Sequence, residues 1–324
     1  MKQLIALLIL VLSVGCSEPK PVVEVKTSPT KEVVEVEPLE KTVPDKEIPI
    51  ENHVEILSEE AALAALKKLG GTFTVEYGHV NTISLQNTKV KDADLALLKS
   101  FPNIISLGLA RTHIGDPGLV HIQGLTKIRF LYLSGTEVSG SGLANLSAME
   151  EIIELELSYT NISDAGLIHL RGLTKLKRLN LSRTQISDIK HLHNQKLIDL
   201  NLTKSNINDA GLVHIRNLTN LKHLNLSHTD VSDAGLEHIR ALRNLDDLIL
   251  EKTAVSDAGL VQLKGMNNLE YISLLDTKVT DAGLEHLKGL RSLYLLVVPR
   301  EGVSEEGKKM LEKAIPDISI QFSY

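Results

Sequence analysis

The sequence predicts an α/β fold, a solenoid of about ten strand-helix repeats of 24 residues each. The phrase V-S-D-A-G-L begins at Val231 and again at Val255, and close copies begin at Ile162, Ile207 and Val279. Aligned by their leucines, the units begin at Val80, Ile104, Ile128, Ile152, Leu176, Leu197, Leu221, Leu245, Leu269 and Leu293. The chain is 43% apolar but only 3% aromatic and has no Trp, which indicates a core of stacked aliphatic layers.

Each unit contains one strand and one return helix. Apolar residues occupy places 1, 4 and 6 of the unit. Places 4 and 6 are two residues apart, which is the period of a β-strand, so we expect a strand in which places 4 and 6 point inward and places 3 and 5 point outward. Leucines at places 16 and 19 have helical spacing. We expect the residue before each Asp to cap the helix, with the Asp favoured by the helix dipole. The capping candidates are Ser163, Ser187, Asn208, Ser232, Ser256 and Thr280.

The pattern L-x-x-L-x-L followed by T-x-[VI]-[ST]-D-A-G-L resembles the leucine-rich repeat, in the subtype with an ITDxGL phrase, and it covers Val80 to about Pro316. The resemblance implies a ribonuclease-inhibitor-like horseshoe whose parallel strands line the concave face. The family has Asn or Cys at place 9, where this chain has hydroxyl residues that we expect to hydrogen-bond the buried turn backbone. They are Thr88, Thr112, Thr136, Thr160, Thr184, Ser205, Thr229, Thr253 and Thr277.

The first 16 residues, MKQLIALLILVLSVGC, have the layout of a secretory signal. They resemble the lipobox of bacterial lipoproteins, in which Cys16 becomes the acylated first residue; Gly15 fits, whereas Ser13 stands where Leu is usual. The resemblance implies export and a lipid anchor in the bacterial envelope. Ser17 after the cysteine favours the outer membrane, facing periplasm or surface. The alternatives are a signal cleaved without lipidation and an uncleaved anchor.

The remaining organisation follows composition. Residues 17–53, rich in Pro, Glu, Val and Lys, are predicted to be a flexible tether, with a Pro-rich docking segment as the alternative. Residues 54–79 are predicted to be an N-terminal cap, with a helix from Ser58 to Leu69 that stops at Gly70. Repeats occupy 80–292. Residues 293–324 form the last repeat and a cap whose alternating Ile318, Ile320 and Phe322 predict a closing strand.

Composition and motifs argue against several functions. A net charge of −6 gives no basic footprint for nucleic acid. Cys16 is the one cysteine, so no intramolecular disulfide forms. Phosphate-loop, dinucleotide, serine-hydrolase and zinc-protease motifs are missing, so we expect no enzymatic activity and no cofactor. We expect no metal either; the alternative is a site built from His169, His191, His193 and His214.

The concave face is the candidate binding surface, and the predicted partner is a protein or peptide held by a monomer. Aromatic residues come early, basic residues in the middle and acidic residues late, and such bands would orient a partner. The candidates are Phe130, Tyr132, Tyr159, Lys177, Arg178, Arg183, Lys204, Lys222, His223, His228, Asp246, Asp247, Glu251, Glu270, Tyr271 and Asp276. The alternatives are a structural envelope protein that binds peptidoglycan or another glycan, an adaptor similar to the repeat half of F-box ubiquitin-ligase subunits, and a face that is merely solvated.

Overall fold

The computed structural model describes residues 57–192 and 196–322, which belong to one compact unit. The predicted signal (1–16) with Cys16, the predicted tether (17–53) and His193 lie outside the described residues.

One sheet of 12 strands runs through the unit in sequence order, β1 to β12. β1 (Thr72–Glu76) pairs antiparallel with β2 (His79–Ser84), and every later neighbour is parallel. The remaining strands are β3 (Ser106–Gly108), β4 (Phe130–Tyr132), β5 (Glu154–Glu156), β6 (Arg178–Asn180), β7 (Asp199–Asn201), β8 (His223–Asn225), β9 (Asp247–Ile249), β10 (Tyr271–Ser273), β11 (Leu295–Val298) and β12 (Ser319–Phe322). The predicted α/β solenoid with one strand per repeat is confirmed.

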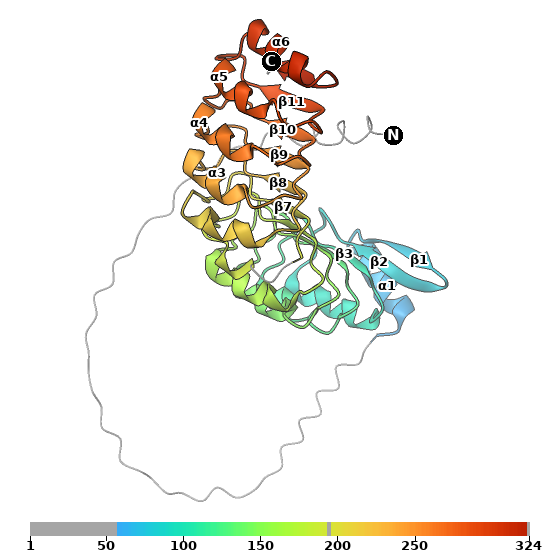
Figure 1. Cartoon of the computed structure of the whole chain (residues 1–324). Helices are drawn as coiled ribbons and strands as arrows, with labels where there is room; N and C mark the ends of the chain where they lie inside the picture. The colour runs from blue at the N-terminus through green and yellow to red at the C-terminus, as the bar shows by residue number, and fades with distance from the viewer. Residues whose placement is uncertain (1–56, 193–195, 323–324) are drawn as a thin grey trace, which may run out of the picture. The chain divides into compact units, whose positions relative to one another are not determined.

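The return limbs contain seven 3-10 helices and four short α-helices among the described residues. The 3-10 helices are η2 (Asp92–Ser100), η3 (Gly142–Leu146), η4 (Asp164–Gly172), η5 (Lys190–Leu192), η6 (Gly211–Asn217), η7 (Val261–Leu263) and η8 (Glu285–Leu287). The α-helices are α2 (Asp116–Leu119), α3 (Asp233–Ile239), α4 (Asp257–Leu260) and α5 (Asp281–Leu284). Apolar places 16, 19 and 22 recur every three residues, which suits the three residues per turn of a 3-10 helix. Figure 1 shows α3, α4 and α5 in a row beside strands β7 to β11.

The core is a set of aliphatic ladders between the strands and the return limbs. Leu155, Leu179, Leu200 and Leu224 are the central residues of four neighbouring strands and pair in register. Each is at most 2% exposed. Because the central residue of a strand points inward, the first and third residues point to the opposite, solvent-facing side of the sheet.

Both ends of the unit carry the predicted helix and strand. α1 (Glu59–Lys68) begins after Ser58, whose side chain accepts a hydrogen bond from the Ala61 amide at 3.2 Å, and Gly70 follows its end with a φ of +89°. At the other end α6 (Glu305–Ala314) precedes β12, which pairs parallel with β11. The predicted helix after Ser58 and the predicted closing strand are confirmed.

The hydroxyls at place 9 form the predicted internal ladder. Each donates to the carbonyl oxygen three residues earlier, as Thr253 does to Leu250 at 2.7 Å and Ser205 to Leu202 at 2.7 Å. The same bond occurs in all nine repeats in which the hydroxyl was predicted. Eight of these residues are buried, and these hydroxyls serve the fold.

The predicted capping role of the residue before each Asp is wrong for three of the six candidates. Thr280 and Asn208 do accept hydrogen bonds from nearby amides, but Ser163, Ser232 and Ser256 make no capping bond. Ser187, Ser232 and Ser256 instead bond the Asp of the preceding repeat, whereas the repeat before Ser163 has Gly140 at the place of that Asp. The Asp233 carboxylate, for example, accepts from the amide of Ser256 at 2.7 Å and from its hydroxyl at 2.6 Å.

This carboxylate ladder links neighbouring repeats. Its pairs are Asp116–Ser139, Asp164–Ser187, Asp209–Ser232, Asp233–Ser256, Asp257–Thr280 and Asp281–Ser304. The glycine of the D-A-G-L phrase leaves room for it: a Cβ on Gly259 would lie 2.4 Å from Oδ1 of Asp233. Burial raises the pKa of Asp116, but hydrogen bonds from Ser139 and Ser141 outweigh it and hold that pKa below its ordinary value.

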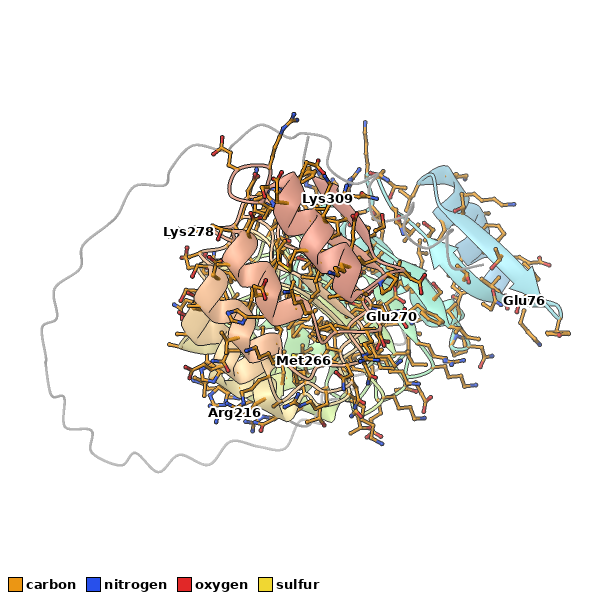
Figure 2. All side chains as sticks on the ribbon, turned by 45° about the horizontal axis from the view of Figure 1, so that its top comes forward. Glu76, Arg216, Met266, Glu270, Lys278 and Lys309 are labelled. Carbon is orange, nitrogen blue, oxygen red and sulfur yellow. The ribbon has the colours of Figure 1, made fainter. Side chains whose placement is uncertain are left out.

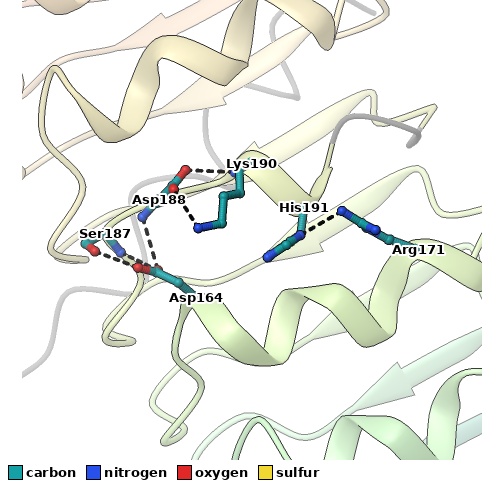
Figure 3. A network of polar contacts seen from close by, with 6 residues as sticks. All are labelled: Asp164, Arg171, Ser187, Asp188, Lys190 and His191. Atoms are coloured by element: carbon teal, nitrogen blue, oxygen red, sulfur yellow. Dashed lines mark hydrogen bonds and ion pairs between the residues drawn. The ribbon is translucent and has the colours of Figure 1, made fainter.

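The shortened fifth repeat changes the ladder locally, as Figure 3 shows. Asp164 still accepts from the Ser187 amide at 2.7 Å, but the next carboxylate, Asp188, accepts from the Lys190 amide of its own repeat at 2.9 Å. The neighbouring repeat approaches closely here, because a Cβ on Gly211 would lie 1.8 Å from the Ser187 carbonyl oxygen. His191 Nδ1 lies 2.9 Å from Nη2 of Arg171. A local change of curvature at this repeat stays a prediction.

Candidate binding face on the strands

The solvent-facing side of the sheet carries the candidate residues in three rows. The strand-start row holds the first residues of β4 to β10: Phe130, Glu154, Arg178, Asp199, His223, Asp247 and Tyr271. The strand-end row holds the third residues of β4 to β8: Tyr132, Glu156, Asn180, Asn201 and Asn225. The turn row lies three residues beyond the third residues of β5 to β9: Tyr159, Arg183, Lys204, His228 and Lys252.

Charges on the strand-start row are paired across neighbouring strands. Arg178 forms an ion pair with Glu154, and His223 lies 2.6 Å from Asp247, which raises the pKa of that imidazole. Beside this row Lys222 lies 3.0 Å from Asp246. The predicted basic and acidic bands therefore neutralise each other where they meet, because residues 24 apart in sequence are neighbours in the sheet.

The sequence reasoning missed three carboxylates on this face, Glu154, Glu156 and Asp199. Burial, with the neighbouring charges of Glu154 and Asp199, raises the pKa of Glu156 to about 7, although hydrogen bonds with Asn180 and Ser134 act against the rise. Burial also raises the pKa of Asp199, against the opposing charges of His223 and Arg178. Their strand places are those of the predicted residues Phe130 and Tyr132, so the repeat alignment could have found them.

Amides and hydroxyls fill the centre of the face. Asn201 Oδ1 accepts from the Thr203 amide and Asn225 Oδ1 from the Ser227 amide, each at 2.9 Å. Asn180 makes the same bond with Ser182. Within residues 57–192 and 196–322, the buried side-chain oxygens without a hydrogen-bond partner are Thr203 Oγ1 and Ser227 Oγ, which occupy the same place in adjacent repeats. Such a buried hydroxyl is costly to leave unsatisfied.

Residues of the turn row have left-handed backbones. The φ angles of Tyr159, Arg183, Lys204, His228 and Lys252 lie between 51° and 56°. The same left-handed place is occupied in the other repeats by Asn87, Arg111, Gly135 and Asp276, so the conformation recurs from the first repeat to the ninth, and asparagine and glycine tolerate it best. Large side chains here cost roughly 1 kcal/mol each, and such local strain clusters at functional sites.

The turn row is also electropositive. The Arg183 guanidinium lies 4.7 Å from the centroid of the Tyr159 ring, a cation–π contact. Partial burial and the positive charges of Arg183 and Lys252 lower the pKa of Lys204. Burial and the charges of Lys204, Lys252 and Arg183 lower the pKa of His228, against an opposing effect of Asp276. The carboxylate nearest to Lys252 is that of Asp276, at 3.7 Å.

The other predicted residues lie around these rows. Phe130 and Tyr132 are half-buried in β4, and burial with the charge of Glu154 raises the pKa of Tyr132. Lys177 is exposed and Glu270 is half-buried. Burial raises the pKa of Tyr271. Glu251 accepts from the Ser273 hydroxyl at 2.9 Å.

Charge alone does not distinguish this face from the rest of the surface. Figure 2 shows charged side chains over both the return limbs, where Arg216 lies, and the strand side, where Glu270 lies. The strand face differs by its strained turn row and by its unsatisfied hydroxyls. The run of five successive large turn-row side chains and the two unsatisfied hydroxyls lie on the strands from β5 to β9, although Arg111 and Asp276 have the same left-handed backbone in the second and ninth repeats.

The part of the chain that the structure describes contains neither a cluster of metal-binding side chains nor a membrane-spanning helix. No group of three or more His, Cys, Asp or Glu there is placed to hold a metal ion; the alternative site included His193, which lies outside it. Among the same residues, none of the helices combines the length and the apolar character that a membrane crossing requires.

Comparisons with known proteins agree with this fold. A family model described as Leucine Rich repeat matches residues 172–189, 193–215 and 217–239. The internalin inlF of Listeria monocytogenes is similar, with a TM-score of 0.60, 16% identity, and coverage of 82% of this chain and 91% of its own. The ectodomain of the Arabidopsis receptor kinase HAESA, in complex with an IDA peptide hormone, has a TM-score of 0.56 and 16% identity over 82% of this chain and 49% of its own. No curated protein sequence is significantly similar.

The fold is thus that of a leucine-rich-repeat protein, as the sequence resemblance predicted. The solved structures support this at the level of architecture, with one parallel strand per repeat and helices on the return limbs.

Proposed function

We propose that the chain is a non-catalytic module that binds a protein or peptide through the strand face between β5 and β9. The observation that carries this proposal is the turn row, in which five successive repeats hold large side chains in a left-handed conformation that asparagine or glycine would adopt with less strain. A purely structural array has no need of Tyr, Arg and Lys at these positions.

Two further observations support the proposal. Tyr159 and Arg183 contact each other on the exposed face, and aromatic residues with arginine are the side chains that most often anchor interfaces. The HAESA ectodomain has the same fold and is in complex with a peptide hormone. The step from a shared fold to a shared kind of ligand is an analogy.

We further propose that the protein is exported and anchored through a lipid on Cys16, as the resemblance of its first 16 residues to a lipobox suggests. The expected product begins at Cys16 and carries acyl chains, and a Cys16→Ser variant is released from the membrane fraction. Mass spectrometry of the mature N-terminus checks this; an unmodified first residue would contradict it. The likeness to the ribonuclease-inhibitor subtype and the monomeric state stay predictions.

Site-specific photo-crosslinking tests the binding proposal. A photoreactive amino acid replaces Tyr159, which is 54% exposed on the turn row, or Val120, which is 47% exposed and follows α2 on a return limb. In the native envelope we expect a defined protein adduct from position 159 and none from position 120. The adduct should disappear when Arg183→Glu and Lys204→Glu are added. Equal adducts from both positions, or an adduct that survives those two changes, would refute the assignment.

A further inference from the structure

The turn row brings the exposed cations Arg183, Lys204 and Lys252 together on the strand face. The amide of Arg183 donates to the carbonyl oxygen of Thr203 in the next repeat at 2.8 Å, and the other turn-row amides make equivalent bonds. This pairing keeps neighbouring turn-row residues at the spacing of adjacent strands, ~4.8 Å. The run from Arg183 through Lys204 and His228 to Lys252 therefore extends over roughly 14 Å.

These cations differ from the other charges of the face because the sheet does not neutralise them. On the strand-start row a carboxylate lies one strand away from each basic side chain, as Glu154 does from Arg178. Among the residues that the structure describes, neither Arg183 nor Lys204 forms an ion pair. The turn row instead places like charges beside one another, and like charges on neighbouring strands destabilise a sheet.

The ionisation of the row shows this repulsion. Desolvation and the positive charges of Arg183 and Lys252 lower the pKa of Lys204, although that side chain is exposed. The Arg183 guanidinium lies 4.7 Å from the centroid of the Tyr159 ring, so this contact holds the cation in place before any ligand arrives. An anion bound among these side chains would relieve the repulsion.

We propose that the partner presents an acidic protein segment to the turn row, with several Asp or Glu carboxylates within about 14 Å that meet Arg183, Lys204 and Lys252. This inference rests on the proposed function and names the chemistry of its partner. A carboxylate that bridges Arg183 and Lys204 replaces their repulsion with charge-assisted hydrogen bonds, which are stronger than bonds between neutral groups.

The length of the row argues against nucleic acid as the occupant. Nucleic-acid binding relies on a long basic footprint that neutralises many phosphates. Here the same place in the next repeat after Lys252 is the exposed carboxylate of Asp276, so a longer polyanion would be repelled at that end. The formal net charge of −6 adds a general repulsion.

The test measures the fluorescence anisotropy of three labelled probes with the full chain at pH 8. The probes are an eight-residue peptide with blocked termini in which four Glu alternate with Gly, the same peptide with Gln for Glu, and pentathymidylate, whose four phosphodiesters match the charge of four Glu. We expect the Glu peptide to bind at least about 10-fold more tightly than the Gln peptide, because only charge distinguishes them. It should also bind more tightly than pentathymidylate, because flexible Glu side chains can converge on the short row.

Matched variants assign the binding to the turn row. Arg183→Glu with Lys204→Glu should weaken binding of the Glu peptide about 10-fold or more. Arg240→Glu with Lys264→Glu makes the same change in charge on exposed parts of the return limbs and should leave the affinity within about 2-fold. Asp276→Asn removes the acidic neighbour of the row and should tighten binding about 2-fold, a gain that misfolding cannot produce. Thermal unfolding confirms that the variants fold.

The inference would be overturned by equal affinity for the Glu and Gln peptides, by tighter binding of pentathymidylate, or by no binding of the Glu peptide at millimolar concentration. Equal affinity of the wild type and the Arg183→Glu, Lys204→Glu variant would also overturn it. The proposed function has its own test, because an adduct from position 159 that depends on Arg183 and Lys204 would still identify a protein-binding face. The two ideas can therefore fail separately.

Discussion

Replacing Gly259 with alanine tests how neighbouring repeats are joined. The new Cβ would lie 2.4 Å from Asp233 Oδ1 and 3.0 Å from Leu236 Cδ1, distances at which Asp233 has to move. That carboxylate accepts two hydrogen bonds from Ser256, at 2.7 and 2.6 Å. Hydrogen bonds to charged groups contribute roughly 1.5–3 kcal/mol each, and the two share one carboxylate and are not additive.

The expected loss is therefore about 2 kcal/mol in the free energy of unfolding. It is the difference between a cost of ~3 kcal/mol for the displaced carboxylate and a gain of up to ~1 kcal/mol, since alanine is favoured over glycine in a helix. Gly289→Ala is the matched control, because a Cβ there meets nothing within 4 Å. Urea unfolding followed by circular dichroism measures both variants. The control should be neutral or slightly stabilised.

A double-mutant cycle isolates the cause. In an Asp233→Ala background the carboxylate is gone, so Gly259→Ala should cost less than ~1 kcal/mol. Gly259→Ala could destabilise the protein no more than Gly289→Ala does, or equally with and without the Asp233 carboxylate. Either result would show that the carboxylate ladder is not the reason that this place requires glycine.

Three more predictions concern single side chains. Because burial raises the pKa of Glu156 to about 7, its folded-state proton is retained to higher pH than in the unfolded chain, so stability falls as pH rises from ~4.5 to ~7. Glu156→Gln should remove this pH dependence and raise the free energy of unfolding by up to ~2 kcal/mol at pH 8 but not at pH 4. The prediction is contradicted if the free energies of unfolding of the two proteins change equally with pH. Lys204→Asn should raise stability by up to ~1 kcal/mol, since asparagine tolerates the left-handed φ of 55°, yet lower the yield of the Tyr159 crosslink; unchanged crosslinking would show that Lys204 does not bind. Thr253→Val should lower the free energy of unfolding, measured in urea, by about 1 kcal/mol, because it removes the 2.7 Å hydrogen bond to Leu250. A neutral result would show that the hydroxyl ladder does not stabilise the fold.

The parts of the fold that repeat in sequence were predictable from the sequence. Leu179 and Leu200 occupy the place that period-two alternation assigned to the core, and both are buried. The hydroxyl of Thr253 bonds within its own turn, so one unit of sequence contained the whole interaction. Interactions of this kind lie within one repeat, so the sequence of that repeat was enough to predict them.

Interactions between repeats were not predictable in the same way. The serine before each Asp was expected to cap its own helix, but the partner of Ser256 is Asp233, 23 residues earlier. A local capping rule compares residues only within a few positions, so it assigned the hydroxyl to the nearest amides. The 3-10 character of the return limbs was also missed, although places 16, 19 and 22 recur every three residues.

The candidate site was predicted in outline but not in its charge arrangement. The sequence identified Arg178, His223 and Asp247 as surface residues, yet their mutual pairing appears only when units 24 residues apart are placed side by side. The strain of the turn row was not anticipated, because Tyr159 and Lys204 are not residue types that indicate a left-handed backbone, although Asn87 and Gly135 at the same place of other repeats are. The half-buried Glu156 was overlooked because the prediction placed the acidic residues of the face only in the late repeats.

The central claim is that the strand face between β5 and β9 binds a protein partner. Its most direct test is the affinity of the protein captured at position 159, measured by surface plasmon resonance against three immobilised chains. These are the wild type, the Arg183→Glu, Lys204→Glu double variant and the Arg240→Glu, Lys264→Glu control. The account predicts a loss of about 10-fold or more for the first variant and less than about 2-fold for the control. Equal affinity for all three chains would contradict it.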